Sequence, residues 1–385
     1  DAACATITGS RKMKIRLKFE KTNLIRLIVA MIFAAVLYYK VTFPIYVLAG
    51  FGACYFLIKS LEIEINNKWL KLALNVVLLG GSSVLTAYMV QYLLLDAELR
   101  AKITDTKMFL NVLCCLVVYV VVQVFTKNAG LTCIISHITL ISFAGIDYFV
   151  YLFRGNEFIF SDLRSISTGL SVAGNYEFVL DDRAVYVVLL SVLYVAFVRK
   201  IHVKFEKRLW MAVVCISIAV FCCAYIGTET EGTVTETWEQ KGSYRNGYIL
   251  NYVLSIRDCF IAEPDGYSEE VVTELENQYS DDGESYVNQN IEKKPTIIVV
   301  MSESYADLSV VGDILTNDLS SVFGAKTPNS EWEFMTGNSM AFLPSGSVVY
   351  QQYISDTPTS IVSNLKNIGY TCVAMHPYYE TGWSR

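Results

Sequence analysis

The sequence predicts a polytopic α-helical membrane domain followed by an α/β domain, and three observations lead to this prediction. Hydrophobic residues make up 53% of the 385 residues and charged residues only 18%, whereas soluble domains average about 25% charged residues. Apolar spans follow one another through the first 227 residues. From Pro295 onward, short apolar runs alternate with helix signals instead, and this alternation is typical of an α/β layer fold.

Seven apolar spans account for the membrane domain. Several of them are shorter than the roughly 20 residues that usually cross a bilayer, but tilt, snorkelling lysines and local thinning accommodate a shorter span. A single span of this kind could be a buried helix of a soluble protein, whereas seven in series exclude that interpretation. We place the spans near residues 23–39, 43–58, 72–95, 108–126, 130–153, 184–198 and 209–227.

Lysine and arginine residues predict the orientation. They cluster before the first span and again between Arg199 and Arg208, and such clusters mark cytoplasmic loops. The two clusters are separated by six predicted crossings, an even number, so both can lie on the cytoplasmic side. The seventh span then places everything after about Gly227 outside the cell. The net charge is -6, and an acidic chain with basic apolar flanks fits membrane topology rather than nucleic-acid binding.

These boundaries divide the chain into four parts. Residues 1–22 form a basic cytoplasmic segment, in which residues 1–12 precede Met13 and are interpreted as upstream read-through or added sequence. Residues 23–228 form the membrane domain, with an outer loop at 154–182 that is either an amphipathic interfacial segment or an ordinary connection. Residues 229–294 form an acidic juxtamembrane connector, and residues 295–385 begin the outer α/β domain.

The outer domain has an expected order of strand, helix, helix, strand. An unbroken apolar run that stops at polar residues is typical of a strand buried on both faces. Threonine followed by proline predicts a helix start, and glycine predicts a helix end. The expected elements are strands at Thr296–Met301 and Tyr370–Met375, a helix at Thr327–Met335 that ends at Gly337, and a helix from Thr357-Pro358 to Gly369.

Three polar residues stand where an α/β fold builds its site. Glu303 follows the first expected strand, His376 follows the second, and Thr327 begins the first expected helix. A helix N-terminus offers free backbone N–H groups to a phosphate, and a carboxylate is a hard ligand for Mg²⁺ or Mn²⁺. A divalent ion would lower the pKa of a threonine hydroxyl that attacks phosphorus. Alone, Thr327 is an ordinary N-cap and Glu303 an ordinary surface carboxylate; the combination is the signal.

Three runs of the outer domain resemble the lipoteichoic acid synthase and phosphoglycerol transferase family of the sulfatase and alkaline phosphatase superfamily. The outer loop and the connector are similar to the family as well, and the resemblance covers about Lys21 to Arg385. The runs are Ile297–Ser304, Asn329–Pro344 and Met375–Pro377 with Gly382–Arg385.

The resemblance implies a role for five residues. Glu303 matches the first metal-binding glutamate of the family, and Thr327 matches the nucleophilic threonine, which also touches the metal. Three further residues match those that line the glycerol-phosphate pocket, where an arginine fits phosphate oxygens as a fork. These are His376, Trp383 and Arg385. The implied cofactor is Mn²⁺ or Mg²⁺.

Two departures from the family pattern affect these roles. The loop from Asp313 to Thr327 is short, and Gly324–Thr327 replaces a more glycine-rich approach to the nucleophile. The chain also stops at Arg385, whereas family members continue and supply a later Asp and His for the metal site. We therefore expect a fragment of a larger gene product, inactive alone, with an incomplete sulfatase-like domain; an intact non-catalytic relative is the other interpretation.

The resemblance implies a multi-pass cell-membrane transferase with an extracellular C-terminal domain. It would move phosphoglycerol from phosphatidylglycerol to a cell-envelope polymer or glycan through a covalent Thr327 intermediate. Alternatives are a phosphoethanolamine transferase, a sulfatase-type hydrolase, or a non-catalytic membrane protein that binds glycerol phosphate. A sulfatase needs a Cys/Ser-x-Pro-x-Arg setting, and Pro328 directly after Thr327 and Glu331 in place of the arginine argue against it.

Overall fold

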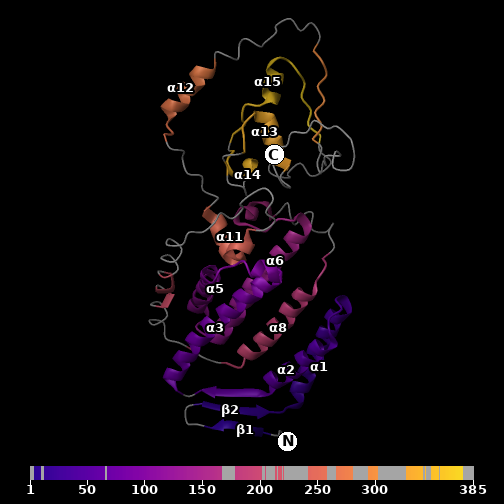
Figure 1. Ribbon diagram of the computed structural model, residues 1–385, viewed down its shortest axis with the longest axis vertical. Helices are drawn as coiled ribbons and strands as arrows, with labels where there is room; N and C mark the ends of the chain where they lie inside the picture. The colour runs from indigo at the N-terminus through magenta and orange to yellow at the C-terminus, as the bar shows by residue number, and fades with distance from the viewer. Residues whose placement is uncertain are drawn as a thin grey trace. The chain divides into compact units, whose positions relative to one another are not determined.

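The computed structural model divides into two compact units, Asp1–Ser255 and Ile256–Arg385, and each is described by itself. In the first unit, helices form a bundle above a small sheet (Figure 1). The structure describes residues 4–9, 13–65, 67–166, 178–201, 204, 213–214, 216–218, 220, 242–257, 266–280, 294–301, 327–340, 343, 348–354 and 356–375.

Long helices form at six of the seven predicted positions. They begin where an Asn, Thr or Asp side chain caps the helix in four cases, at Asn67, Thr104, Asn128 and Asp181, which satisfies backbone N–H groups that have no helical partner. The helices are α1 (Lys21–Lys40), α2 (Ile45–Ser60), α3 (Lys68–Leu94), α5 (Asp105–Thr126), α6 (Ala129–Arg154) and α8 (Asp182–Val198).

Within the part of the chain that the structure describes, four helices are long and apolar enough to cross a bilayer, as in a multi-pass membrane protein. These are α1, α3, α5 and residues 129–153 of α6, while α2 is apolar but only 16 residues long. Side chains on α1 such as Ile25 and Val29 are each 63% exposed, as expected of a surface that faces lipid rather than water. The predicted span at 209–227 lies mostly outside the described residues, so the number seven stays a prediction.

The bundle has two apolar cores. The larger joins α3, α5 and α6 around Val90, Cys115 and Tyr119, which are fully buried. The smaller joins α1, α2 and α8 around Ala34, Phe51 and Val185. Each helix thus buries one side against its neighbours and exposes apolar residues on the other, which is the arrangement that a bilayer stabilises.

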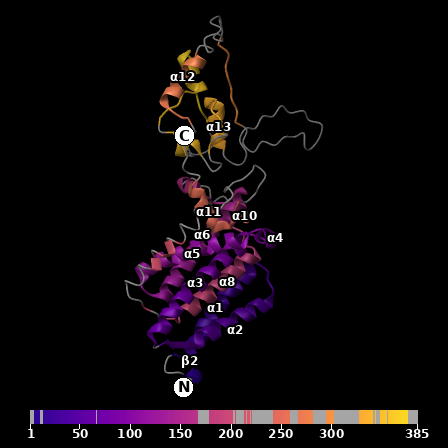
Figure 2. The same ribbon diagram turned by 60° about the vertical axis from the view of Figure 1, so that its left-hand side comes forward.

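A three-stranded antiparallel sheet, β1-β2-β3, lies at one end of the bundle, which we call the sheet end (Figures 1 and 2). The strands are β1 (Cys4–Gly9), β2 (Met13–Lys18) and β3 (Leu61–Ile65). In the β2–β3 register Lys14 pairs with Glu64 and Arg16 pairs with Glu62. Because cross-strand pairs of opposite charge stabilise a sheet, this explains why the basic segment, for which no strand was predicted, forms strands.

Part of the connector between the spans and the outer domain is helical and packs on the bundle. Short helices α10 (Ser243–Asn246) and α11 (Tyr248–Arg257) pack at the end of the bundle opposite the sheet, which we call the α11 end. Tyr248, Leu250 and Leu254 are fully buried in the larger core. The part of the predicted connector that forms α10 and α11 therefore belongs to the membrane bundle.

The described residues on either side of the last predicted span lie near different ends of the bundle. Lys204 bridges to Asn128 at the sheet end, whereas the backbone N–H of Ser243 donates to Glu157 at the α11 end. The predicted span at 209–227 lies mostly outside the described residues, so a membrane crossing between Lys204 and Ser243 stays a prediction.

The second unit contains four helices among the described residues. Helix α12 (Glu269–Ser280) lies in the acidic segment, followed by α13 (Thr327–Thr336), α14 (Val349–Gln352) and α15 (Ile361–Asn367). Helix α13 packs against α14 and α15. The predicted ends of α13 and α15 are confirmed, because Gly337 and Gly369 adopt positive φ values of 74° and 87°, which glycine tolerates best.

The predicted α/β layer is not evident in the described part of this unit. Residues 294–301 and 370–375 are extended but form no described ladder, and Ile298 and Val300 are 82% and 79% exposed. An apolar run becomes a buried strand only where neighbouring strands pair with its backbone and other layers cover its faces, and no described segment provides them. The predicted sulfatase-like sheet is therefore corrected to a mainly helical arrangement of the described residues.

The start of α15 also differs from the prediction. The helix begins after Ser360, not at Thr357-Pro358, because the Ser360 hydroxyl accepts from Ser363 N at 3.3 Å while Ser360 N donates to the Ser363 hydroxyl at 2.8 Å. This reciprocal cap satisfies two backbone groups. Thr357-Pro358, three residues earlier, offers no such reciprocal pair.

Candidate functional site

Thr327 is the first residue of α13 and is partly buried. The sequence forms a helix here because Pro328 is already restricted to a helical φ and lacks the N–H that the first turn leaves unpaired. The backbone N–H groups of this turn have no partner within the helix. Thr327 therefore presents its hydroxyl beside a group of N–H donors and a positive helix dipole, which suits an anion such as a phosphate.

Apolar and polar contacts fix α13 in place. Asn329 and Trp332 are buried; the Asn329 Oδ1 accepts from Val349 N at 3.4 Å, and the Trp332 ring meets Tyr350 edge-on at 5.8 Å. Helix α14 thus holds the first turns of α13, so the position of Thr327 is determined by packing and not by its own side chain.

The turn after α13 is held by Glu333. Its Oε1 accepts from Met340 N at 2.6 Å and from the Ser339 hydroxyl at 3.4 Å. A carboxylate that accepts from a backbone N–H in this way orders a loop. The middle run of the family resemblance is therefore a helix with a fixed turn, and Glu333 has a structural role in it.

The other four predicted site residues, Glu303, His376, Trp383 and Arg385, lie outside the described residues. The pairing of Glu303 with Thr327 and the pocket that the other three would line therefore stay predictions. Over the described ranges, no three or more His, Cys, Asp or Glu side chains gather as a metal site would require, so the expected Mn²⁺ or Mg²⁺ depends on the resemblance.

One contact brings the two predicted strand segments together at their starts. The Lys294 ammonium donates to the Ile368 carbonyl and lies 5.7 Å from the centre of the Tyr370 ring. Lys294 precedes the first predicted strand and Tyr370 begins the second. Their neighbouring starts are compatible with adjacent strands, although neither segment forms a ladder.

A buried polar network at the α11 end was not predicted from the sequence. Asn111 is its centre: its Nδ2 donates to Asn246 O at 2.7 Å, and its Oδ1 accepts from Gln91 Nε2 at 3.2 Å and from Leu250 N at 3.0 Å. Gln91 Oε1 in turn accepts from Tyr248 N at 3.3 Å. Side chains of α3 and α5 thus supply the partners for the first backbone groups of α11.

Glu157 extends this network from the outer loop. Its two carboxylate oxygens accept from Ser243 N at 2.9 Å and Asn251 Nδ2 at 2.8 Å, and Glu157 is only 7% exposed. Asn251 Oδ1 accepts from Asn246 Nδ2 at 3.3 Å. Both carboxylate oxygens of Glu157 accept hydrogen bonds from the protein. We therefore interpret the network as the contact that holds α10 and α11 on the bundle, and not as a ligand site.

We expect Glu157→Ala to release α10 and α11 from the bundle. The change leaves two buried donors without their acceptor, and each such loss costs about 1–3 kcal/mol. Trypsin cleavage after Arg245, which lies between Glu157's two partners, should become much faster. The matched control is Glu98→Ala, an exposed carboxylate at the same end; equal cleavage of both variants would refute the docking role.

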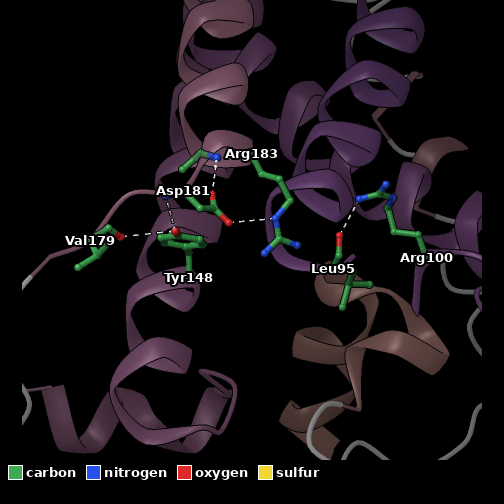
Figure 3. A network of polar contacts seen from close by, with 7 residues as sticks. Leu95, Arg100, Tyr148, Val179, Asp181 and Arg183 are labelled. Carbon is green, nitrogen blue, oxygen red and sulfur yellow. Dashed lines mark hydrogen bonds and ion pairs between the residues drawn. The ribbon is translucent and has the colours of Figure 1, made fainter. Parts of the chain in front are cut away.

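Charged groups at the start of α8 are also paired within the protein (Figure 3). Arg183 Nε lies 3.0 Å from Asp181 Oδ2, and Asp181 N donates to the Tyr148 hydroxyl at 3.0 Å. On the right of the same view, Arg100 Nη1 donates to Leu95 O at 2.6 Å. These groups fix the ends of the helices, and the described charges at this end offer no cationic surplus for an anionic ligand.

A second polar network lies within the apolar helices, around His137. The Thr86 hydroxyl is 2.8 Å from both His137 Nδ1 and the Tyr119 hydroxyl, and His137 Nε2 is 3.0 Å from the Ser191 hydroxyl. All four helices of this contact, α3, α5, α6 and α8, thereby share one hydrogen-bonded chain. Since both ring nitrogens are hydrogen-bonded to side chains of other helices, we interpret His137 as a residue that joins helices and not as a free base.

We expect His137→Leu to lower the thermal midpoint of the protein in detergent modestly. Interhelical hydrogen bonds within a membrane contribute about 1 kcal/mol each, and this change removes two. Ile138→Leu, at a neighbouring position that is 50% exposed, is the control. An unchanged midpoint in His137→Leu would show that the network does not stabilise the bundle.

Comparison with known proteins adds one distant relative. The chain is 32% identical over 163 residues to a protein of Rhizobium meliloti (strain 1021) provisionally named cyclic beta-1,2-glucan modification protein. The match covers 38% of this chain and 25% of that protein, so the chain spans about a quarter of the length of this relative. No family model and no solved structure matches the chain.

The relative agrees in part with what the sequence predicts. Its name indicates that it modifies a glucan, and a glycan was one of the two acceptors expected here. Membership in the phosphoglycerol transferase family, the enzymatic activity and the site residues stay predictions.

Proposed function

We propose that this chain belongs to a membrane-anchored transferase that moves phosphoglycerol from phosphatidylglycerol to a glycan of the cell envelope. The observation that carries the proposal is the position of Thr327 on the first turn of α13, held there by α14. The four helices able to cross a bilayer and the glucan-modifying name of the relative support a lipid donor and a glycan acceptor.

The proposed reaction has two displacements. The Thr327 oxygen forms a bond to phosphorus and loses its proton, the bond from phosphorus to the diacylglycerol oxygen breaks, and diacylglycerol leaves with a proton. A glycan hydroxyl then attacks the phosphorus and loses its proton, the bond from phosphorus to the threonine oxygen breaks, and that oxygen takes up a proton. The N–H groups of the first turn of α13 would stabilise the negative oxygens of the phosphoryl group in both displacements.

The remaining predicted residues complete the proposal by resemblance. Glu303 and Thr327 would hold Mn²⁺ or Mg²⁺, which lowers the pKa of a bound hydroxyl. His376, Trp383 and Arg385 would bind the glycerol-phosphate group, and the domain that carries them would lie outside the cell.

A head-group assay tests the proposed substrates. The protein, expressed from its complete gene and reconstituted in vesicles, is given lipid labelled in the glycerol head group together with a cyclic glucan. We expect label in the glucan and equal amounts of released diacylglycerol. Label transfer from phosphatidylethanolamine in preference to phosphatidylglycerol would instead favour a phosphoethanolamine transferase, and no transfer from either lipid would favour a non-catalytic binder.

A further inference from the structure

Four cationic side chains gather at the sheet end of the bundle, where α1, α2 and α8 meet. Arg26 lies in α1, Lys59 in the last turn of α2, and Arg199 and Lys200 directly after α8. The smaller apolar core packs these three helices together, so residues far apart in the sequence reach one place.

The cations are held close to one another. The Lys200 ammonium donates to the Lys59 carbonyl at 2.7 Å, which ties the end of α8 to the end of α2. Arg199, Lys200 and Arg26 all lie near enough for their charges to act on the Lys59 ammonium. These contacts make the four residues a single cluster, which we call the cation cluster.

The cluster carries more positive than negative charge among the described groups around it. Glu62 and Glu20 act on Lys200, but Glu20 is already paired with Lys18 at 2.8 Å. The pKa of Lys200 is lowered, first by its burial and then by the positive charge of Arg26. The positive charges of the cluster repel one another. An anion bound at the cluster would reduce this repulsion.

The surface beside the cluster is apolar. Arg26 is exposed on α1, and Ile25, directly before it, and Val29, about one turn after it, are each 63% exposed. A soluble anion would contact only the cations. A lipid can place its acyl chains on the apolar surface and its phosphate beside the cations.

We propose that the cation cluster binds the head group of an anionic phospholipid in the leaflet at the sheet end of the bundle. By the predicted orientation this is the cytoplasmic leaflet, opposite the side of the proposed transfer reaction. The bound lipid would be a fixed partner of α1, α2 and α8 and not the donor that is consumed. The inference does not depend on the proposed function, because it concerns residues of the first unit, whereas the proposed reaction concerns residues of the second.

Lipid retention measured by native mass spectrometry tests the cluster. The full chain in a mild detergent is incubated with dioleoyl phosphatidylglycerol or dioleoyl phosphatidylcholine, and the fraction with one bound lipid is counted. We expect the anionic lipid to be retained and the double variant Arg26→Gln/Arg199→Gln to retain it about tenfold less, since each cation near an anionic lipid contributes substantially. Both residues are exposed, so the helices should fold unchanged.

The control is Lys68→Gln/Lys71→Gln, which removes the same charge from the start of α3 at the same end. It should keep retention within about threefold of the unmodified chain, because these lysines are outside the cluster. Equal losses in both double variants would mean a general surface potential and overturn the site. Equal retention of the two lipids by the unmodified chain would overturn it as well.

Discussion

Thr327→Ala should abolish diacylglycerol release from phosphatidylglycerol, by at least about a thousandfold, in protein expressed from the complete gene. Removing the atom that forms the bond to phosphorus leaves only binding and the donors around it to accelerate the reaction, and loss of a nucleophile has effects of this size or larger. Helix α13 should persist, because its buried contacts come from Pro328, Asn329 and Trp332. The measurement is the initial rate of diacylglycerol release at saturating lipid.

Two further variants separate chemistry from structure. Thr357→Ala makes the same change in the second threonine-proline pair, which is exposed and precedes α15 instead of beginning it; its rate should be unchanged. Thr327→Ser keeps a hydroxyl and should keep part of the rate. If Thr327→Ala retained more than a tenth of the rate, Thr327 would not be the nucleophile.

Gly247→Ala should lower the stability of the membrane bundle by about 3 kcal/mol or more. Gly247 joins α10 to α11 with φ 78° and ψ 147°, a region that side chains with a Cβ rarely occupy. An added Cβ would also overlap the Asn111 amide. Asn111 cannot move aside cheaply, because both its side-chain atoms are hydrogen-bonded to other helices.

Gly155→Ala is the matched control for this prediction. Gly155 ends α6 with φ 73°, and nothing lies within 4 Å of an added Cβ, so only the cost of the backbone conformation applies, about 1 kcal/mol. Chemical unfolding in detergent, followed by helical circular dichroism, compares the two. Equal destabilisation would show that Gly247 does not seat α11 against Asn111.

Local signals predicted the helices well. The starts and ends of α13 and the end of α15 follow from Pro328, Gly337 and Gly369, whose effects depend on adjacent residues only. The apolar spans predicted the six long helices of the bundle for the same reason, since their length and composition are properties of single segments. Thr327 was placed correctly at a helix start by this reasoning.

The sheet was missed although its signal is present. Met13–Lys18 and Leu61–Ile65 both alternate apolar and charged residues, a period that predicts strands. The first was interpreted as a topology signal because of its lysines and arginines, and the second lies between two apolar spans. The pairing of Lys14 with Glu64 joins segments 50 positions apart, which no single segment reveals.

The docking network was missed for a related reason. Gln91, Asn111 and Glu157 are isolated polar residues near the ends of apolar segments, and their common partner α11 follows some 90 residues after Glu157 along the chain. The available signal was the cost of burying such residues unpaired, which implies a partner without identifying it. The predicted strands at 296–301 and 370–375 show the reverse: their apolar pattern is clear, but a segment becomes a strand only beside neighbouring strands.

The most direct test of the central claim looks for the covalent intermediate. The protein from the complete gene is incubated with phosphatidylglycerol without acceptor, digested with trypsin, and the peptide that begins at Thr327 after Lys326 is sequenced by mass spectrometry. The account predicts one glycerophosphate group on Thr327, lost again when a glucan is added. Diacylglycerol release with an unmodified Thr327, or with the group on another residue, would contradict it.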